Sequence, residues 1–478
     1  MVASEVAPFA KTGGLADVLG ALPPALARLG HHVDVVMPRY RGIAAGTGAG
    51  RVTVAAAGRV ADAPFFAHES AGVRTYFVEQ PQYFDRPSLY GEGSRDYPDN
   101  PERFAFLARA ALAWAAAAGV RYDVIHAHDW QAGLVPVLLP VEYHHHPVLG
   151  GTPAVFTIHN LAYQGNFPPA WVPALDLDWS LMHVDAVEYW GQISFLKGGI
   201  NFSRVITTVS PRYAREIQTP EFGFGFDGIL RRRSGDLIGI LNGIDYDQWD
   251  PARDPHLPEP FSASKLAGKR AAKRAVLADF GLPVTREALA RPLVGMVSRM
   301  VDQKGLDLVA AVADELPRLP ASFVALGTGE LRYEEMWRAL AARHGDRIGA
   351  RIGFDEGLAH RIEGGADLFL MPSRFEPCGL NQMYSLRYGT VPVVRATGGL
   401  FDTVRDYNPV AGEGTGFMFS EYSPEALLGI LRRALQIYQD RKTWRRIQAA
   451  GMREDNSWDA SARRYVGAYE RAAARGRA

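Results

Sequence analysis

Short apolar runs alternate with amphipathic segments along most of the chain. Runs of this kind, rich in β-branched residues and bounded by turn formers, predict buried strands. We expect strands at residues 33–37, 52–55, 74–78, 123–126, 154–158 and 204–209 in the first half, and at 293–298, 322–326, 350–353, 367–371 and 391–395 in the second. Because helical segments lie between these runs, the pattern predicts an α/β protein with two doubly wound parallel sheets.

The first helix is predicted directly after the pair Gly13-Gly14, with Gly30 as its stop. Pro23 and Pro24 lie inside this segment, so we expect a kink or a break there. Residues 1–4 resemble a fragment of a strand. Either the sequence is annotated to start too late, or the first sheet has a shortened edge. Helical spacing is shown by Leu15, Val18, Leu19, Leu22, Leu26 and Leu29.

Length and composition narrow the class of protein. A chain of 478 residues exceeds one comfortable core, so two domains are expected, with a seam near 237–249. Lys plus Arg and Asp plus Glu both number 52, and this balance argues against a nucleic-acid partner. Cys378 is the single cysteine, which excludes an intrachain disulfide and favours a reducing compartment. Without a signal peptide or a long apolar run, no membrane association is expected, and the cytoplasm is the predicted location.

The stretch 374–382, Arg-Phe-Glu-Pro-Cys-Gly-Leu-Asn-Gln, follows a predicted buried strand and precedes a predicted helix. Such a turn lies at the carboxyl edge of the sheet, where open α/β folds bind ligands. Gly379 lets the backbone approach a ligand, and the first amides of the helix suit phosphate or sugar oxygens. Glu376 adds a carboxylate, which suits a polyol or a developing cation.

Together with four other motifs, this stretch resembles the bacterial glycogen (starch) synthases, glycosyltransferase family 5, which are retaining glucosyltransferases that use ADP-glucose. The other motifs are Lys-Thr-Gly-Gly-Leu-Ala-Asp at 11–17, His-Ala-His-Asp-Trp at 126–130, Thr-Ile-His-Asn at 157–160, and Arg299 with Lys304. The resemblance implies the GT-B fold, with two doubly wound Rossmann-like domains facing each other across a cleft. It places the acceptor-side starch synthase domain at 1–239 and the nucleotide-sugar domain at 240–455. Residues 456–478, with a helix at 458–475, are expected to cross back to the first domain.

The resemblance also assigns chemistry. It implies that Arg299 and Lys304 neutralise the leaving diphosphate without a metal or other cofactor, that His159 lies against the donor glucose, and that Glu376 binds glucose hydroxyls and stabilises positive charge. A same-face internal-return route is implied, rather than the two-carboxylate scheme of glycosidases. The substrate-binding residues it implies are Lys11, Gly13, Gly14, Asp17, Tyr90, Asp129, Asn160, Asn242, Phe354, Cys378, Gly379 and Leu380.

Several of these residues have a second interpretation. Asp17 also suits the helix dipole, Phe354 could be a core residue rather than a stacking partner of adenine, and Cys378 serves backbone packing rather than nucleophilic attack. The stretch Thr397-Gly398-Gly399 echoes the first Gly-Gly turn, either as a second ligand-facing turn or simply as a well-made one. A metal site at His126 and His128, or at 144–146, is rejected because no further ligands follow at suitable spacing.

The function expected is transfer of glucose from ADP-glucose to the non-reducing end of an α-1,4-glucan such as glycogen. A related transferase that prefers UDP-glucose, or one of the sucrose type, is the second interpretation, and an inactive glucan-binding protein is the third. A Rossmann dehydrogenase fits poorly, because no Gly-x-Gly-x-x-Gly with a following acid is present. A group of aromatic residues in the first half could stack on the glucan rings of the acceptor, or could instead belong to the core. These residues are Trp171, Trp179, Tyr189 and Trp190.

Overall fold

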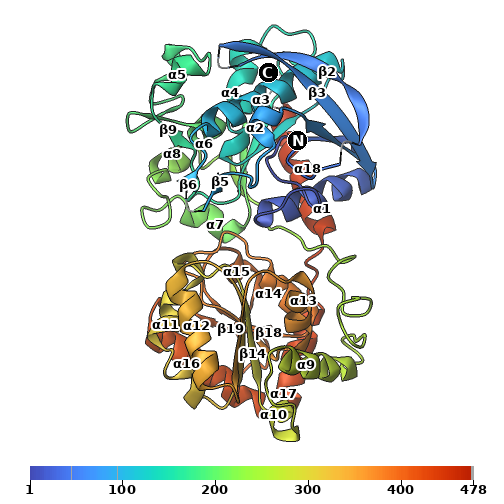
Figure 1. Cartoon of the computed structure of the whole chain (residues 1–478), viewed down its shortest axis with the longest axis vertical. Coiled ribbons are helices and arrows are strands. Elements are labelled where there is room, and N and C mark those ends of the chain that lie inside the picture. The colour runs from blue at the N-terminus through green and yellow to red at the C-terminus, as the bar shows by residue number, and fades with distance from the viewer. Residues whose placement is uncertain (45, 57, 94, 475–478) are drawn as a thin grey trace. The chain divides into compact units, whose positions relative to one another are not determined.

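The computed structural model describes residues 1–478 except 45, 57, 94 and 475–478. The chain divides into two compact units (Figure 1). The first unit comprises Met1–Val209, Ala214–Gly243 and Trp458–Ala478, and the second comprises Ser210–Tyr213 and Ile244–Ser457. The units change near residues 243 and 457, whereas the domain limits expected from the sequence follow residues 239 and 455. Arg475, the last residue of the predicted C-terminal helix, lies outside the described residues.

Two four-stranded ladders form the main sheet of the first unit, in the orders β1-β4-β3-β2 and β13-β12-β8-β7. Val2 joins the two ladders by parallel bridges to Val36 on β1 and Ala127 on β7. The predicted strand fragment at the start of the chain is therefore this single bridging residue and its neighbours. The strands are β1 Val33–Pro38, β2 Thr47–Ala56, β3 Arg59–Ser70, β4 Val73–Val78, β7 Ile125–His128, β8 Ala154–Ile158, β12 Val205–Thr208 and β13 Leu237–Gly239.

The sheet of the first unit differs from the prediction, since part of it is antiparallel. β2 and β3 form a long hairpin, and β3 also pairs antiparallel with β4, whereas β1–β4, β7–β8, β8–β12 and β12–β13 are parallel. β3 was not predicted from the sequence, because its alternating, half-exposed residues form no continuous apolar run. The predicted strand 123–126 is also shifted, so that His126 and His128 both lie within β7.

Helix α1 (Gly14–Arg28) continues through Pro23 and Pro24, so the predicted break does not occur. Its buried apolar face, rather than an unbroken set of backbone hydrogen bonds, holds this helix in place. The other helices that carry first-unit residues are α2 Pro81–Phe84, α3 Asn100–Ala117, η1 Trp130–Ala132, α4 Leu134–Glu142, α5 Trp171–Ala174, η2 Trp179–Leu181, α6 Phe195–Phe202, α7 Pro211–Glu216, α8 Asp227–Arg232 and α18 Trp458–Ala474. Two small sheets complete this unit, with β5 Gly91–Glu92, β6 Arg95–Asp96, β9 Asn166–Phe167, β10 Glu188–Tyr189 and β11 Gln192–Ser194.

The second unit contains a six-stranded, fully parallel sheet in the order β16-β15-β14-β17-β18-β19. Its strands are β14 Leu293–Val297, β15 Ser322–Gly327, β16 Ile348–Ile352, β17 Leu368–Met371, β18 Val391–Arg395 and β19 Phe417–Phe419. Its helices are α9 Ala267–Asp279, α10 Arg286–Ala290, η3 Asp302–Lys304, α11 Leu306–Ala311, η4 Leu316–Arg318, α12 Leu331–Arg343, α13 Glu356–Gly365, α14 Asn381–Arg387, α15 Gly398–Thr403, α16 Pro424–Tyr438 and α17 Arg441–Met452.

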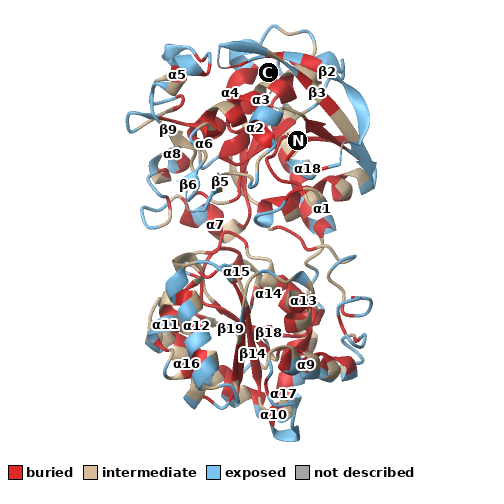
Figure 2. Cartoon of the chain, in the orientation of Figure 1, coloured by how far each residue is buried: buried red, intermediate tan, exposed pale blue. Residues whose placement is uncertain are grey.

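Both faces of this second sheet are covered. Leu368 and Leu370 of β17 belong to one hydrophobic cluster, whereas Phe369 and Met371 belong to another. Because successive side chains of a strand point to opposite faces, the two clusters lie on opposite sides of the sheet. Figure 2 shows the same distribution, with buried residues concentrated in the strands and on the inner sides of the helices. The doubly wound prediction is confirmed for this unit. None of the described helices is long and apolar enough to cross a membrane.

Candidate active site

The loop between β17 and α14 carries the carboxylate expected to face the sugar. Glu376 is 4% exposed, and its Oε2 accepts hydrogen bonds from Lys304 Nζ at 2.6 Å and from Ser373 Oγ at 3.0 Å. Lys304 is partly exposed, at 19% of its side chain. A buried carboxylate needs such a partner, because its charge would otherwise be strongly disfavoured away from water. The two residues predicted to act on sugar and diphosphate are therefore a contacting ion pair.

The turn that follows Glu376 is shaped by one glycine. Gly379 has φ of +71°, a left-handed conformation that side chains other than glycine rarely adopt. Gln382 of α14 holds the turn, donating from Nε2 to the carbonyls of Cys378 at 3.0 Å and Gly379 at 3.1 Å. Leu380 is the N-cap residue of α14, so the first amides of this helix follow the motif directly. Cys378 is buried with its thiol reduced, which accords with a packing role.

The second Gly-Gly pair supports this loop. A Cβ on Gly398 would lie 1.8 Å from the carbonyl oxygen of Glu376, and one on Gly399 would lie 2.1 Å from that of Cys378. The amide of Gly399 donates to the carbonyl of Glu376 at 3.1 Å. Positions 13 and 14 are different, because a Cβ there would meet nothing within 4 Å. Of the two glycine turns, the one in the second unit packs on the motif, and the one in the first unit stands next to open space.

The cations of the second unit occupy the end of β14 and the short helix after it. Arg299 is exposed two residues beyond β14, and its Nη2 lies 3.3 Å from Gln303 Oε1. Lys304 ends η3, and Gly305 after it approaches Pro372 so closely that a Cβ would lie 2.0 Å from the Pro372 carbonyl oxygen. That approach brings Lys304 to the segment that carries Glu376. Phe354 is 84% exposed, which excludes the core interpretation and leaves its ring available to a ligand.

In the first unit, a buried glutamate outside the predicted set holds the turn at 11–14. Glu5 is 4% exposed and accepts hydrogen bonds from Thr12 N and Thr12 Oγ1, both at 2.6 Å, and from Gly13 N at 3.3 Å. Tyr90 also donates to Glu5, at 2.5 Å. The role of Tyr90 seen here is therefore to position this carboxylate, and burial beside Glu5 raises the pKa of the Tyr90 hydroxyl.

Lys11 projects from the same turn and donates to Asp17 Oδ1 at 2.6 Å. The side chains of Lys11 and Asp17 are 45% and 25% exposed, so their ion pair is accessible to solvent and to a ligand. Asp17 also lies in the first turn of α1, where a carboxylate favours the helix dipole. Both interpretations of Asp17 are therefore compatible with its position.

The ends of β7 and β8 bring together Asp129 and His159. Asp129 Oδ1 accepts the backbone amide of His159 at 2.7 Å, and Asp129 has φ of +55°. Burial raises the pKa of Asp129 to about 7, against the lowering effect of the amides of His159 and Asn160. Asn160, half-buried beside them, accepts the amide of Ala162 at 3.1 Å through Oδ1. A carboxyl of this kind can carry a proton near neutral pH.

His159 ends a row of three buried histidines. Its Nε2 lies 3.0 Å from Nδ1 of His128, whose ring centroid lies 3.9 Å from that of His126. His126 in turn contacts Thr157 Oγ1 at 2.6 Å and the hydroxyl of Tyr469, on α18, at 2.9 Å. Burial lowers the pKa of His159 to about 3 and lowers those of His128 and His126 well below the usual value. At neutral pH His159 is therefore an uncharged group that can donate or accept a hydrogen bond.

Asn242, the remaining predicted residue, follows β13 in the first unit and is 6% exposed. Its Oδ1 has no hydrogen-bond partner among the described residues. A buried polar atom without a partner is unusual and is compatible with a bound ligand.

Three organising residues were outside the predicted set, namely Glu5, His128 and Ser373. Glu5 offered a signal, because it is an acid in an otherwise apolar stretch just before the Gly-Gly turn. His128 was considered only as a metal ligand, and no group of three or more His, Cys, Asp or Glu that could hold a metal occurs among the described residues.

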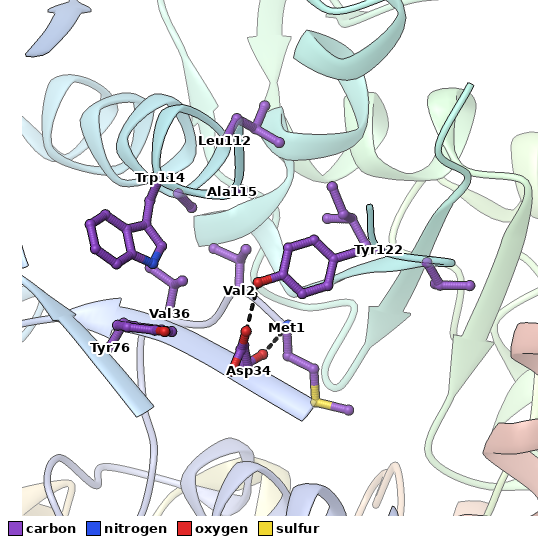
Figure 3. A pocket seen from close by; sticks show the side chains of 12 residues that line it. Met1, Val2, Asp34, Val36, Tyr76, Leu112, Trp114, Ala115 and Tyr122 are labelled. Atoms are coloured by element: carbon purple, nitrogen blue, oxygen red, sulfur yellow. Dashed lines mark hydrogen bonds between the residues drawn. The ribbon is translucent and has the colours of Figure 1, made fainter. Parts of the chain in front are cut away.

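A cavity elsewhere in the first unit is separate from these residues (Figure 3). It has a volume of about 40 Å³ and is lined partly by Met1, Asp34, Trp114 and Tyr122. Tyr122 donates to Asp34 Oδ2 at 2.6 Å, and the amino group of Met1 donates to the Asp34 carbonyl at 2.7 Å. None of the predicted site residues lines it, so it has no part in the candidate site.

Comparison with known proteins matches two family models to the chain. Residues 1–232 match the starch synthase catalytic domain, and residues 283–450 match the glycosyl transferases group 1 domain. The glycogen synthase of Anaeromyxobacter dehalogenans (strain 2CP-C) is 56% identical over 470 residues, covering 98% of each chain. That of Koribacter versatilis (strain Ellin345) is 48% identical and covers 98% of this chain and 97% of the relative.

Among solved structures, the catalytic domain of starch synthase IV from Arabidopsis thaliana, bound to ADP and acarbose, superposes with a TM-score of 0.91 at 34% identity. The match covers 99% of this chain and 98% of that one. A sucrose-phosphate synthase from Thermosynechococcus elongatus shares the fold, with a TM-score of 0.60 at 18% identity over 98% of this chain and 97% of that one. These matches confirm the predicted two-domain α/β fold of the GT-B class. The chain therefore belongs to the glycogen and starch synthase family of glycosyltransferases.

Proposed function

We propose that this protein transfers glucose from ADP-glucose to the non-reducing end of an α-1,4-glucan, with retention of configuration, in the synthesis of glycogen. Relatives that are 56% identical over nearly the whole chain bear the name glycogen synthase, and the similar starch synthase IV structure is bound to ADP and acarbose. The observation that carries the proposal is the contact between Lys304 and the buried Glu376, directly before the first amides of α14. This arrangement places a cation, a carboxylate and helix amides on neighbouring loops of one sheet edge.

The chemistry requires charge stabilisation at two places. As the bond between the anomeric carbon and the diphosphate breaks, negative charge grows on ADP, and Arg299, Lys304 and the amides at Gly379–Leu380 would stabilise it. Positive charge grows on the glucose ring, and Glu376 would stabilise that charge and bind sugar hydroxyls. When Lys304 turns towards the diphosphate, Glu376 keeps its hydrogen bond from Ser373.

Retention follows from attack on the face from which ADP departs. The acceptor hydroxyl forms the new bond to the anomeric carbon, and its proton passes to a phosphate oxygen of the departing ADP. In this route no enzyme carboxylate becomes glucosylated. A glucosyl group trapped on Glu376 or Asp129, detected by mass spectrometry, would contradict it.

The first unit would bind the donor sugar. We assign His159 to a glucose hydroxyl, because its buried, uncharged ring at the end of β8 can exchange hydrogen bonds without carrying charge. Asp129, Asn160 and Asn242 would contact the sugar or the acceptor, and Lys11 the donor phosphates. Phe354 of the second unit would stack on adenine, since its ring is exposed. The proposed location is the cytoplasm, with no nucleic-acid partner, no membrane partner and no cofactor.

Incorporation of labelled glucose into glycogen, from ADP-glucose and UDP-glucose in parallel, tests the proposal. We expect a clear preference for ADP-glucose and an α-1,4-linked product. Lys304→Ala should lower kcat at least about 100-fold, because it removes stabilisation of the leaving diphosphate. Lys442→Ala, which removes an exposed lysine of the same unit, is the control and should retain the activity.

Other outcomes separate the alternatives. Preference for UDP-glucose would assign the protein to another branch of retaining transferases. Absence of transfer from either donor by the folded protein would favour a glucan-binding role. Near-normal kcat in Lys304→Ala at saturating ADP-glucose would disprove the assigned phosphate site.

A further inference from the structure

Two large aromatic side chains of the first unit are held at the surface in conformations that bulky residues rarely adopt. Trp190 is 85% exposed with φ of +53°, and Phe224 is 40% exposed with φ of +46°. The sequence alone allows Trp190 to belong to a core, and the exposure of its side chain excludes that interpretation. Left-handed backbone is strained at a bulky residue, and strained residues of this kind cluster at functional sites.

Trp190 occupies a tight hairpin turn. Tyr189 of β10 pairs with Gln192 of β11, which leaves only Trp190 and Gly191 as the loop. Both have positive φ, +53° and +75°, so the turn is of type I′, whose first position strongly favours asparagine, aspartate or glycine. The amide of Gly191 is bound by Glu188 Oε1 at 2.8 Å. Folding alone would therefore favour Asn-Gly here, and neither the turn nor burial explains the tryptophan.

Phe224 is fixed from two sides. Its carbonyl oxygen accepts hydrogen bonds from Gln164 Nε2 at 2.9 Å and from the hydroxyl of Tyr189 at 3.1 Å. Gly225 allows this approach, because a Cβ there would lie 2.3 Å from the Tyr189 hydroxyl. The Tyr189 ring is itself stacked on the buried Phe226, with centroids 4.4 Å apart. Trp190 and Phe224 thus flank one anchored tyrosine.

This aromatic pair is joined to the loop that carries His159. Gln164, which binds the Phe224 carbonyl, lies on the short loop from His159 to β9. β9 pairs with β11, the strand that follows the Trp190 turn. The same loop carries Tyr163, which is 51% exposed. The hairpin and the sugar-facing end of β8 are therefore parts of one connected surface.

We propose that Trp190 and Phe224 form a stacking platform for glucose rings of the acceptor α-1,4-glucan, at positions along the chain away from the reacting end. Pyranose rings offer apolar C–H faces that stack on aromatic side chains, and their hydroxyls suit the polar groups that surround the pair, namely Gln164, Glu188 and the Tyr189 hydroxyl. The inference rests on the proposed glucan acceptor. It adds a surface that determines specificity for the acceptor. The roles assigned above to the residues of the transfer step do not depend on this surface.

Substitution by asparagine tests the platform without disturbing the turns. Trp190→Asn and Phe224→Asn should fold at least as stably as the parent, because asparagine tolerates the left-handed conformation. We expect KM for glycogen to rise about 3- to 10-fold in each, as lost aromatic stacking implies. KM for ADP-glucose, and kcat at saturating glycogen, should not change. Retarded migration in gels that contain glycogen should weaken in parallel.

Two controls make the result specific. Trp190→Phe keeps an aromatic face and should retain most of the affinity for glycogen. Leu331→Ala removes an exposed apolar side chain of the second unit and should have no effect.

Unchanged KM for glycogen in both asparagine variants would overturn the platform. A lower kcat with unchanged KM for glycogen would also overturn it, because the residues would then act in the transfer step. A changed sedimentation coefficient in Trp190→Asn without glucan would instead assign the surface to contact with a second copy of the chain. If the parent itself transfers no glucose to glycogen, the proposed function fails, whereas retarded migration still tests the platform.

Discussion

Burial sets the charge of the histidines at the ends of β7 and β8. His126, His128 and His159 are all buried, and burial lowers the pKa of each from its usual 6.5. In a glucosyl transfer this is useful, because a cationic histidine next to the glucose would oppose the positive charge that develops on the ring. The contact between His128 Nδ1 and His159 Nε2 couples the tautomers of the two rings, because only one of these two nitrogens can carry the proton between them.

The same shifts make stability depend on pH. Below its usual pKa of 6.5 each histidine binds a proton in the unfolded chain but not in the folded one, so stability rises with pH up to that value. Asp129 acts in the opposite direction. Its pKa is raised from 3.8 to about 7, so the folded chain retains a proton that the unfolded chain releases, and this contribution falls as pH rises. Three histidines outweigh one carboxyl, so we expect a net loss of stability on acidification.

His128→Gln tests this linkage. The variant removes one of the protons that the unfolded chain takes up, so the dependence of the unfolding free energy on pH should become shallower by about 1.4 kcal/mol per pH unit between about pH 4.5 and pH 6. Urea titrations at a series of pH values measure the slope. A slope equal to that of the parent would show that His128 binds protons alike in the folded and unfolded chains.

At the scale of single elements, the turn at 11–14 depends on one carboxylate. No atom lies within 4 Å of a Cβ placed on Gly13 or Gly14, so packing does not hold this turn. The hydrogen bonds that Thr12 and Gly13 donate to Glu5 hold it instead. Such bonds to a charged acceptor are about twice as strong as neutral ones. The turn that carries Lys11 is therefore preorganised from inside the unit.

Glu5→Gln should loosen this turn while the fold remains intact. We expect KM for ADP-glucose to rise about 10-fold, since a neutral amide cannot replace the hydrogen bonds that the carboxylate accepts from Thr12 and Gly13. Hydrogen exchange at the Thr12 and Gly13 amides should accelerate. Glu102→Gln, which alters another contact between a tyrosine and a glutamate of this unit, is the control and should leave KM unchanged. Unaltered exchange at Gly13 would exclude the preorganising role.

Elements with a strong periodic signal were predicted well. The strand 154–158 matches β8, and the helix predicted after Gly14 matches α1, except that the break expected at its prolines is absent. Both elements bury one or both faces, and such burial determines the spacing of their apolar residues. β3 was missed because an antiparallel hairpin with one exposed face lacks the continuous apolar run of a central strand.

Site residues on motifs could be named from the sequence, but their supporting partners could not. The contact between Lys304 and Glu376 joins two loops 72 positions apart, and that between Glu5 and Tyr90 spans 85. Contacts between residues so far apart in the sequence can be identified only once the order of the strands is known. The strain at Trp190 was equally hidden, since a positive φ at a tryptophan has no sequence signature.

For the whole molecule, the division into units does not follow chain order. The first unit is completed by residues from the C-terminal end, and α18 contacts α1, β8 and β12. Tyr465 of α18 is fully buried, and Ser461 donates to the carbonyl of Leu241 at 2.5 Å. The Tyr469 hydroxyl contacts His126 beneath the site. Without this helix, the first unit would expose an apolar face and lose a partner of its histidine row.

A set of fragments tests this division. Residues 1–243 alone should unfold without a cooperative transition, because burying side chains such as Tyr465 contributes about 3 kcal/mol each. Joining 1–243 to 458–478 through a flexible linker of about 15 residues should restore a cooperative thermal transition in circular dichroism. Residues 244–457 contain the complete six-stranded sheet and should fold separately. If 1–243 alone melted as cooperatively, and at the same temperature, as the linked form, α18 would be an accessory to the first unit rather than part of its core.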